Sequence, residues 1–296
     1  MTSNIGLLAA AGLLSGVLAG FLGIGGGTIL VPIMVRLGFT PIEAVATSSL
    51  AILVTSITGS IQNWRMGFLD LNKVLLLGFP ALVTAQLGVW LANVFPDYML
   101  LAGFGILLIS NVYLVGLRKR VVAQRSQQES LQASSETLVE PDAEALVDPP
   151  HEPVPVKDSS PEQSPPEQPP MNPTLARLIT GSAAGVLAGL FGVGGGIIMV
   201  PLQILLLGEG IKTAVQTSLG VIVITAIAAC IGHALNGSVL FHAGLILGLG
   251  GLVGVQISTR FLPKLPDQAI TFMFRALLAL LSVYIFWQAW NSYSTQ

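Results

Sequence analysis

The chain has 296 residues, of which 52% are hydrophobic and 9% are charged, and its mean hydropathy is +0.77. This composition excludes an ordinary soluble domain and indicates a polytopic membrane protein that lies in a lipid bilayer. The 13 Lys and Arg residues are too scattered for a nucleic-acid-binding surface, and the single cysteine excludes a disulfide framework. The apolar segments also hold too few His, Asp, Glu and Cys residues for a catalytic cluster. We therefore expect no metal, no cofactor and no enzymatic activity.

Apolar runs occur in two matching sets of five along the chain. Most have the roughly 20 residues that a helix needs to cross a bilayer at about 1.5 Å per residue. The second run of the first set would reach only about 16 Å, which is half a crossing. The first set consists of residues 5–23, 28–38, 43–62, 71–93 and 98–117, and the second of residues 174–192, 197–208, 212–232, 240–261 and 267–290.

One motif is written twice, as GVLAGFLGIGGGTILVP from Gly16 to Pro32 and as GVLAGLFGVGGGIIMVP from Gly185 to Pro201. In each copy a glycine triplet interrupts an apolar run. Non-helical backbone cannot face hydrocarbon, because its unpaired polar groups would each cost several kcal/mol, so each break must be buried in protein or line a cavity. We expect a glycine-broken hairpin at the start of each half of the chain.

Residues 118–173 differ from the rest of the chain, because eleven prolines lie between Pro141 and Pro173 among Glu, Gln, Ser and Asp. No core can form from this composition, so we expect a disordered cytoplasmic linker without chemistry. It separates a first transmembrane repeat, residues 1–117, from a second, residues 174–296.

The positions of basic residues predict how the two repeats are oriented, because short cytoplasmic loops are rich in Lys and Arg. Arg65 and Lys73 place the 63–73 loop inside, whereas the matching loop at 233–243 has no Lys or Arg. The fold class that follows is an all-α polytopic membrane protein of two inverted-topology repeats. Each repeat would be a Gly-broken hairpin plus three transmembrane helices, with both chain termini outside.

The glycine triplets are candidates for anion binding. Successive glycines leave backbone N–H groups in a concave arrangement, and a helix that begins there adds partial positive charge. The alternative is close helix packing through small residues, which we favour for Gly16, Gly20, Gly185 and Gly189. The predicted substrate-binding residues of this group are Gly25, Gly26, Gly27 and Thr28 with Gly194, Gly195 and Gly196.

Several polar residues recur at a spacing of 170, and each could bind substrate or serve structure. Hydroxyls inside helices often bond a carbonyl one turn earlier, and glutamines often join helices. A histidine at membrane depth could couple transport to protons, although interface histidines are more common. The substrate-binding candidates are Thr47, Ser48, Thr217, Ser218, Gln86 and Gln256, and the ion-coupling candidates are His233 and its counterpart Asn63.

The duplicated G-x-GGG-x-x-x-VP element, the Thr-Ser pair of the next helix and the H-x-x-x-G turn resemble the TauE/SafE-type sulfite exporter family, also called the toluene sulfonate uptake permeases. The resemblance covers roughly 240 residues of both halves. It implies a plasma-membrane permease for small sulfur-containing anions such as sulfite, thiosulfate or sulfonates, coupled to an ion gradient. Its partners would be a small anion and the bilayer. A passive anion channel and a transporter of small carboxylates remain the alternatives, and the oligomeric state stays open.

Overall fold

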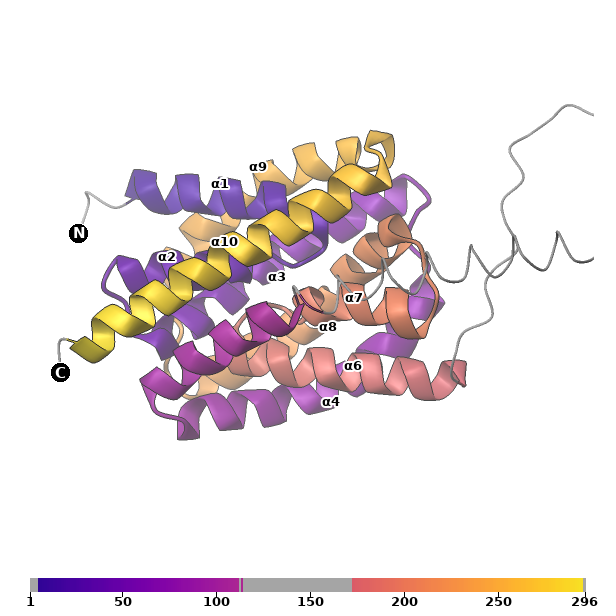
Figure 1. The fold of residues 1–296 in the computed structure, drawn as a ribbon. Helices are drawn as coiled ribbons and strands as arrows, with labels where there is room; N and C mark the ends of the chain where they lie inside the picture. Colours follow the sequence, from indigo (N-terminus) through magenta and orange to yellow (C-terminus); the bar gives the residue numbers. More distant parts are fainter. Residues whose placement is uncertain (1–4, 112, 114–171, 295–296) are drawn as a thin grey trace, which may run out of the picture.

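The computed structural model describes residues 5–111, 113 and 172–294, and all regular elements in this part of the chain are helices (Figure 1). Most of the linker expected at 118–173 lies outside the described residues. The first half contains α1 (Ile5–Leu22), α2 (Gly27–Arg36), α3 (Pro41–Arg65), α4 (Leu71–Val94) and a helix at Asp97–Asn111. The second half contains α6 (Pro173–Phe191), α7 (Gly196–Leu206), α8 (Ile211–Leu235), α9 (Phe241–Phe261), a short 3-10 turn at Leu262–Lys264, and α10 (Asp267–Ser294).

Seven of the described helices are long and apolar enough to cross a membrane, whereas α2, α7 and the helix at Asp97–Asn111 are shorter. The lateral surface of the bundle exposes large apolar side chains that only lipid can cover. On α4, for example, Phe79 is 73% exposed and Trp90 60%. Such a surface excludes a water-soluble protein and confirms the all-α polytopic membrane class.

Local sequence signals explain where several helices begin. At the start of α3, Thr40 and Glu43 form a reciprocal capping box, and Pro41 occupies the first helical turn. The Asp70 carboxylate caps α4 by accepting hydrogen bonds from two backbone N–H groups, and the Asn172 side chain caps α6. These caps fix the helix starts next to the loops that join consecutive spans.

Glycines on α1 and α6 let each helix touch its neighbour along the backbone. A Cβ built on Gly16 would lie 2.1 Å from the Gly251 carbonyl oxygen of α9, and one built on Gly185 would lie 2.2 Å from the Ala81 oxygen of α4. Gly189 similarly meets Ala85, and Gly20 meets the Ser258 side chain. The expectation that these four glycines serve packing is confirmed.

The helix contacts are reciprocal between the two halves. α1 of the first half packs most extensively on α9 of the second, and α6 of the second packs most extensively on α4 of the first. The start of α1 and the end of α10 lie at the same end of the bundle (Figure 1). The two halves are therefore interlocked rather than side by side, while their inverted orientation across a membrane stays a prediction.

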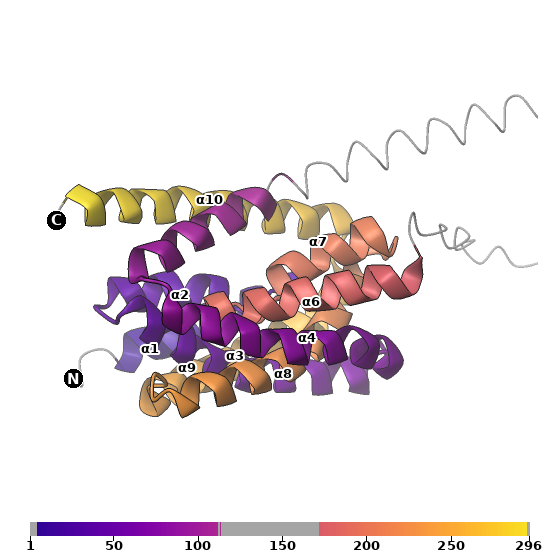
Figure 2. The ribbon, with the colours of Figure 1, turned by 90° about the horizontal axis from the view of Figure 1, so that it is seen from below.

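The last helix of each half lies on one side of the bundle, over the residues that flank the glycine breaks (Figure 2). Leu108 of the helix at Asp97–Asn111 and Phe274 of α10 belong to the same buried apolar cluster as Ile24 and Val193. Phe104 contacts Phe191 with ring centroids 5.8 Å apart. This cluster closes one side of the region in which the two breaks meet.

Candidate functional site

Two glycine-rich breaks meet in the middle of the bundle. Between α1 and α2, the φ angles of Gly25 and Gly26 are 74° and 82°, and between α6 and α7 those of Gly194 and Gly195 are 72° and 78°. A residue with a side chain adopts this left-handed region only at a cost, so the chain reverses here because glycine is present. The half-helices begin at Gly27 and Gly196, one residue earlier than the sequence indicates.

The two breaks cross with their backbones in direct contact, and we call this region the crossing (residues 23–28 and 192–197). A Cβ on Gly27 would lie 2.2 Å from the Gly192 carbonyl oxygen, and a Cβ on Gly196 would lie 2.1 Å from the Gly23 oxygen. Real Cβ atoms essentially never come within 3.0 Å of such an atom. Only glycine therefore fits at the first position of each half-helix.

Serines from the third helix of each repeat reach across to the opposite break. The Ser48 hydroxyl lies 2.9 Å from the Gly192 carbonyl oxygen, and the Ser218 hydroxyl lies 2.8 Å from the Gly23 oxygen. Each also lies within 2.9 Å of a carbonyl in its own helix, at Val45 or Val215. The expected local back-bond is thus present in both serines, and substrate contact stays a prediction.

Two further hydroxyls hold the glycine segments, and the sequence pattern did not single them out. Thr225 of α8 donates to the Gly194 carbonyl oxygen at 3.0 Å, and Ser15 of α1 donates to the Gly26 oxygen at 3.1 Å. Thr225 has a repeat-matched counterpart in Thr55, so comparison of the two halves of the sequence could have identified it. Ser15 has none, because Ala184 stands at the matching position.

The backbone N–H groups of the crossing differ from its carbonyls, because they lack partners. Within the described residues no acceptor is recorded for the N–H groups of residues 25–28 or of residues 194–197, although all eight residues are buried. The Thr28 hydroxyl is also buried and has no partner in the described part of the chain. A buried N–H without a partner costs about 1 to 3 kcal/mol, so this cluster of donors is suited to accept a ligand with several acceptor oxygens.

Two isoleucines pack against the glycine breaks. Cβ atoms built on Gly25 and Gly194 would each lie within 3.3 Å of side-chain atoms of both Ile52 and Ile222. The two isoleucines are fully buried and occupy matching positions in α3 and α8. The structure is therefore that of a closed site, and a ligand would enter only after these side chains or their helices move.

The remaining substrate-binding candidates differ in burial. Thr47 is buried and accepts a hydrogen bond from the Leu240 N–H at 3.0 Å, and Thr217 is buried beside Ser218 on α8. Gln86 of α4 and Gln256 of α9 are exposed residues. The Gln86 amide donates to the Ala228 carbonyl oxygen of α8 at 2.7 Å, which joins two helices.

The two ion-coupling candidates are buried, and His233 lies beside one of the glycine breaks. His233 Nε2 lies 2.9 Å from the Gly189 carbonyl oxygen, and because a carbonyl only accepts, Nε2 carries the proton. Its Nδ1 and both amide atoms of Asn63 have no partner among the described residues. Gly189 precedes Gly192 by three residues, which is less than one helical turn, so His233 contacts α6 next to the crossing.

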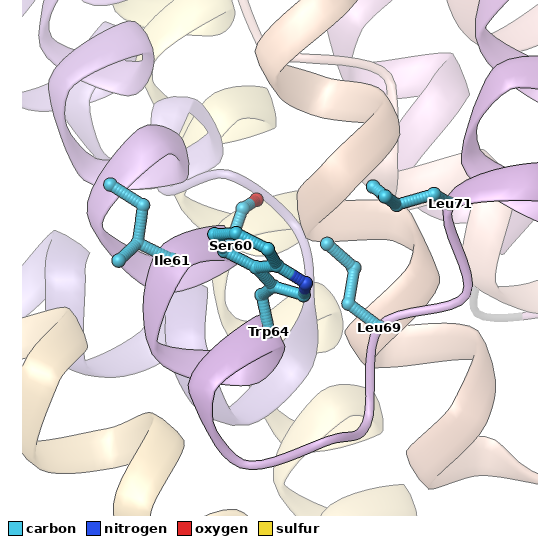
Figure 3. Close-up of a pocket in the computed structure, with 5 residues that line it drawn as sticks. All are labelled: Ser60, Ile61, Trp64, Leu69 and Leu71. Atoms are coloured by element: carbon cyan, nitrogen blue, oxygen red, sulfur yellow. The ribbon is translucent and has the colours of Figure 1, made fainter.

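A shallow pocket opens where α3 ends and α4 begins (Figure 3). It contains no cationic side chain, so it does not suit a small anion. Its lining consists of Ser60, Ile61, Trp64, Leu69 and Leu71.

Comparison with known proteins agrees with this architecture. The sequence profile of the family described as "Sulfite exporter TauE/SafE" matches residues 8–285. The probable membrane transporter protein YunE of Bacillus subtilis is 23% identical over 95% of this chain and 97% of its own length. The probable membrane transporter protein YdhB of the same species is 24% identical over 92% and 97%, and the probable membrane transporter protein MJ0441 of Methanocaldococcus jannaschii is 22% identical over 94% of both chains. No solved structure matches the chain.

These findings agree with one another, because the profile spans both repeats, the relatives share almost their whole length with the chain, and the described helices are those of a multi-pass membrane protein. The chain belongs to the TauE/SafE sulfite exporter family of membrane transporters.

Proposed function

We propose that the protein is a secondary transporter that moves small sulfur-containing anions, such as sulfite, thiosulfate or organosulfonates, across the plasma membrane. The observation that carries this proposal is the set of buried backbone N–H groups without partners at residues 25–28 and 194–197. A tetrahedral or pyramidal oxyanion has enough acceptor oxygens to satisfy several of them at once. Because these donors are fixed in place before binding, they can stabilise an anion even though no buried Lys or Arg lies among the described residues of the site.

The two half-helices strengthen the anion preference. α2 and α7 begin at the crossing, and the N-terminal end of each contributes partial positive charge. Both helices have ten residues or more, so the peptide dipoles of several turns add up. In this proposal the oxyanion replaces the isoleucine side chains between the two N-terminal ends, and Thr28 adds a hydroxyl.

The closed crossing favours a transporter over a passive channel. A channel needs a continuous path, whereas Ile52 and Ile222 fill the space beside the glycines. Movement of α3 and α8 away from the breaks, first on one side and then on the other, would open the site alternately. That movement would break the hydrogen bonds of Ser48 and Ser218, because each joins its helix to the opposite break.

His233 and Asn63 are the candidates for coupling to an ion gradient in this proposal. Both are buried at matched positions and retain polar atoms without partners. Because His233 bonds the Gly189 carbonyl oxygen, three residues before the crossing, a change in its protonation would act on the end of α6 and on the glycine break that follows it.

Flux into proteoliposomes tests the proposal. Purified full-length protein should take up sulfite faster than protein-free liposomes, and an imposed pH gradient should drive accumulation above the external concentration. Uptake that only equilibrates sulfite, with or without any ion gradient, would indicate a passive channel. Acetate uptake at equal concentration separates a carboxylate transporter from a sulfur-anion transporter.

A further inference from the structure

We propose that Lys73, Gln203 and Glu209 form a second anion-binding site, at the mouth of the bundle where α4 begins and α7 ends. In the closed structure the Glu209 carboxylate occupies the place that a small oxyanion takes when this site is open. The ligand class rests on the proposed function, whereas the site itself rests on the contacts described below. We call these three residues the mouth site.

An ion pair joins the two halves of the chain at the mouth site. Lys73 Nζ of α4 lies 2.9 Å from Glu209 Oε1, in the segment between α7 and α8. The Lys73 side chain is 33% exposed and the Glu209 side chain only 12%. The second carboxylate oxygen, Oε2, is buried and has no partner among the described residues. The carboxylate is thus held by one contact and leaves an acceptor unsatisfied, which lowers the cost of displacing it.

Gln203 precedes Glu209 by six residues and lies in the last two turns of α7. Its side chain is fully buried, and neither amide atom has a partner within the described residues. Met199 and Leu207, one turn before and after it, pack in the same apolar cluster as Val74, the residue that follows Lys73. Gln203 therefore lies on the face of α7 that carries Met199 and Leu207. The Glu209 N–H also donates to the Gln203 carbonyl oxygen, at 3.3 Å, which holds the two residues together.

The repeat shows that the fold does not require polar groups at this place. The matching residues in the other half of the molecule are Met34, Phe39 and Ala243, for Gln203, Glu209 and Lys73 respectively. All three belong to one apolar cluster, so the corresponding positions do converge in space. The bundle thus has apolar residues at these positions in one half, and an ion pair and a buried amide at the matching positions in the other.

The chemistry of the mouth site fits a small oxyanion. The Lys73 ammonium and the Gln203 amide nitrogen supply donors, and a carboxylate resembles a sulfur oxyanion in charge and in its acceptor oxygens. Glu209 stands between Gly208, whose φ is 66°, and Gly210, so its backbone can turn and release the carboxylate to water. The same face of α7 continues through Met199 to Gly196, which leads from the mouth site to the crossing.

A titration of purified full-length protein with sodium sulfite tests the proposal, with binding measured by calorimetry at constant ionic strength. Glu209→Gln removes the competing carboxylate but keeps the side-chain shape, so sulfite should bind about fivefold or more tightly than to the wild type. Lys73→Gln should abolish binding at this site, and Lys73→Arg should retain it. The matched control is Asp267→Asn, which removes the same charge from the Lys212–Asp267 pair, 3.6 Å apart. It should leave the affinity unchanged.

Two results would overturn the mouth site. One is an affinity in Glu209→Gln that equals or falls below that of the wild type, and the other is an equal gain in Asp267→Asn, which would indicate a general charge effect. The neutral Lys73→Gln, Glu209→Gln double variant covers the case in which a single variant unfolds, and it should bind no sulfite here. Sulfite flux that persists while Glu209→Gln binds no more tightly would refute this site and leave the proposed function standing.

Discussion

Replacement of Gly27 by Ala distinguishes the crossing from an ordinary helix start. Gly27 is the first residue of α2 and does not have a positive φ. Helix propensity alone would therefore make Ala the better residue by about 1 kcal/mol. The crossing predicts the opposite sign, because the new Cβ would lie 2.2 Å from the Gly192 carbonyl oxygen and 2.6 Å from an Ile52 methyl group.

The size of the destabilisation depends on which atom the new Cβ at Gly27 would contact. A flexible side chain could turn away, but the Gly192 oxygen is backbone and belongs to the opposite break, so the two breaks must separate. Overpacking of this kind costs about 1 to 3 kcal/mol, which exceeds the gain in propensity. We therefore expect lower thermal stability in Gly27→Ala and in its counterpart Gly196→Ala, together with loss of sulfite flux.

Thermal unfolding in detergent, followed by intrinsic fluorescence, and sulfite flux in proteoliposomes are the two assays. The control is Gly67→Ala, because Gly67 has a φ of 76° but nothing within 4 Å of its Cβ position. That variant should lose stability through backbone strain of about 1 to 2 kcal/mol and retain flux. A Gly27→Ala protein that is as stable and as active as the wild type would refute close backbone contact at the crossing.

Further variants test the other parts of the account. Ser48→Ala and Ser218→Ala should each destabilise the protein by about 1 kcal/mol, measured by thermal unfolding; an effect in only one would contradict their matched roles at the crossing. His233→Gln should retain sulfite exchange but lose accumulation driven by a pH gradient, and unchanged accumulation would remove His233 from coupling. Deletion of residues 127–169 should leave expression and flux nearly intact, and total loss of either would give the linker a structural or binding role. Reporter fusions in the loops at 63–73 and 233–240 should report opposite sides of the membrane, and the same side for both would exclude the inverted repeat.

The sequence was most informative where the two repeats agree. The duplicated glycines predicted the broken hairpins because no other residue type tolerates both positive φ at Gly26 and backbone contact at Gly27. The Ser48 and Ser218 pair was found for the same reason. Periodicity in a bundle that faces lipid does not separate the inner from the outer helix face, because both are apolar. The sequence pattern therefore also selected Gln86 and Gln256, which are exposed residues of α4 and α9, and substrate contact at either stays a prediction.

Features present in only one repeat could not be predicted in this way. Lys73, Gln203 and Glu209 have apolar counterparts, so comparison of the two halves does not indicate that they have a function. The Lys73–Glu209 contact joins the start of α4 to the segment after α7, which brings together residues 136 positions apart. Tertiary contacts of this kind have no local signature in the chain.

The central claim is that the backbone N–H groups of the two glycine breaks bind the substrate anion. A structure of the protein determined with bound selenite, an oxyanion of the same shape as sulfite with a strong anomalous signal, tests it most directly. The account predicts selenite oxygens within about 3 Å of the N–H groups of Gly27 and Gly196, with Ile52 and Ile222 displaced from the glycines. Selenite bound only to Lys or Arg side chains, with the crossing still closed by the two isoleucines, would contradict it.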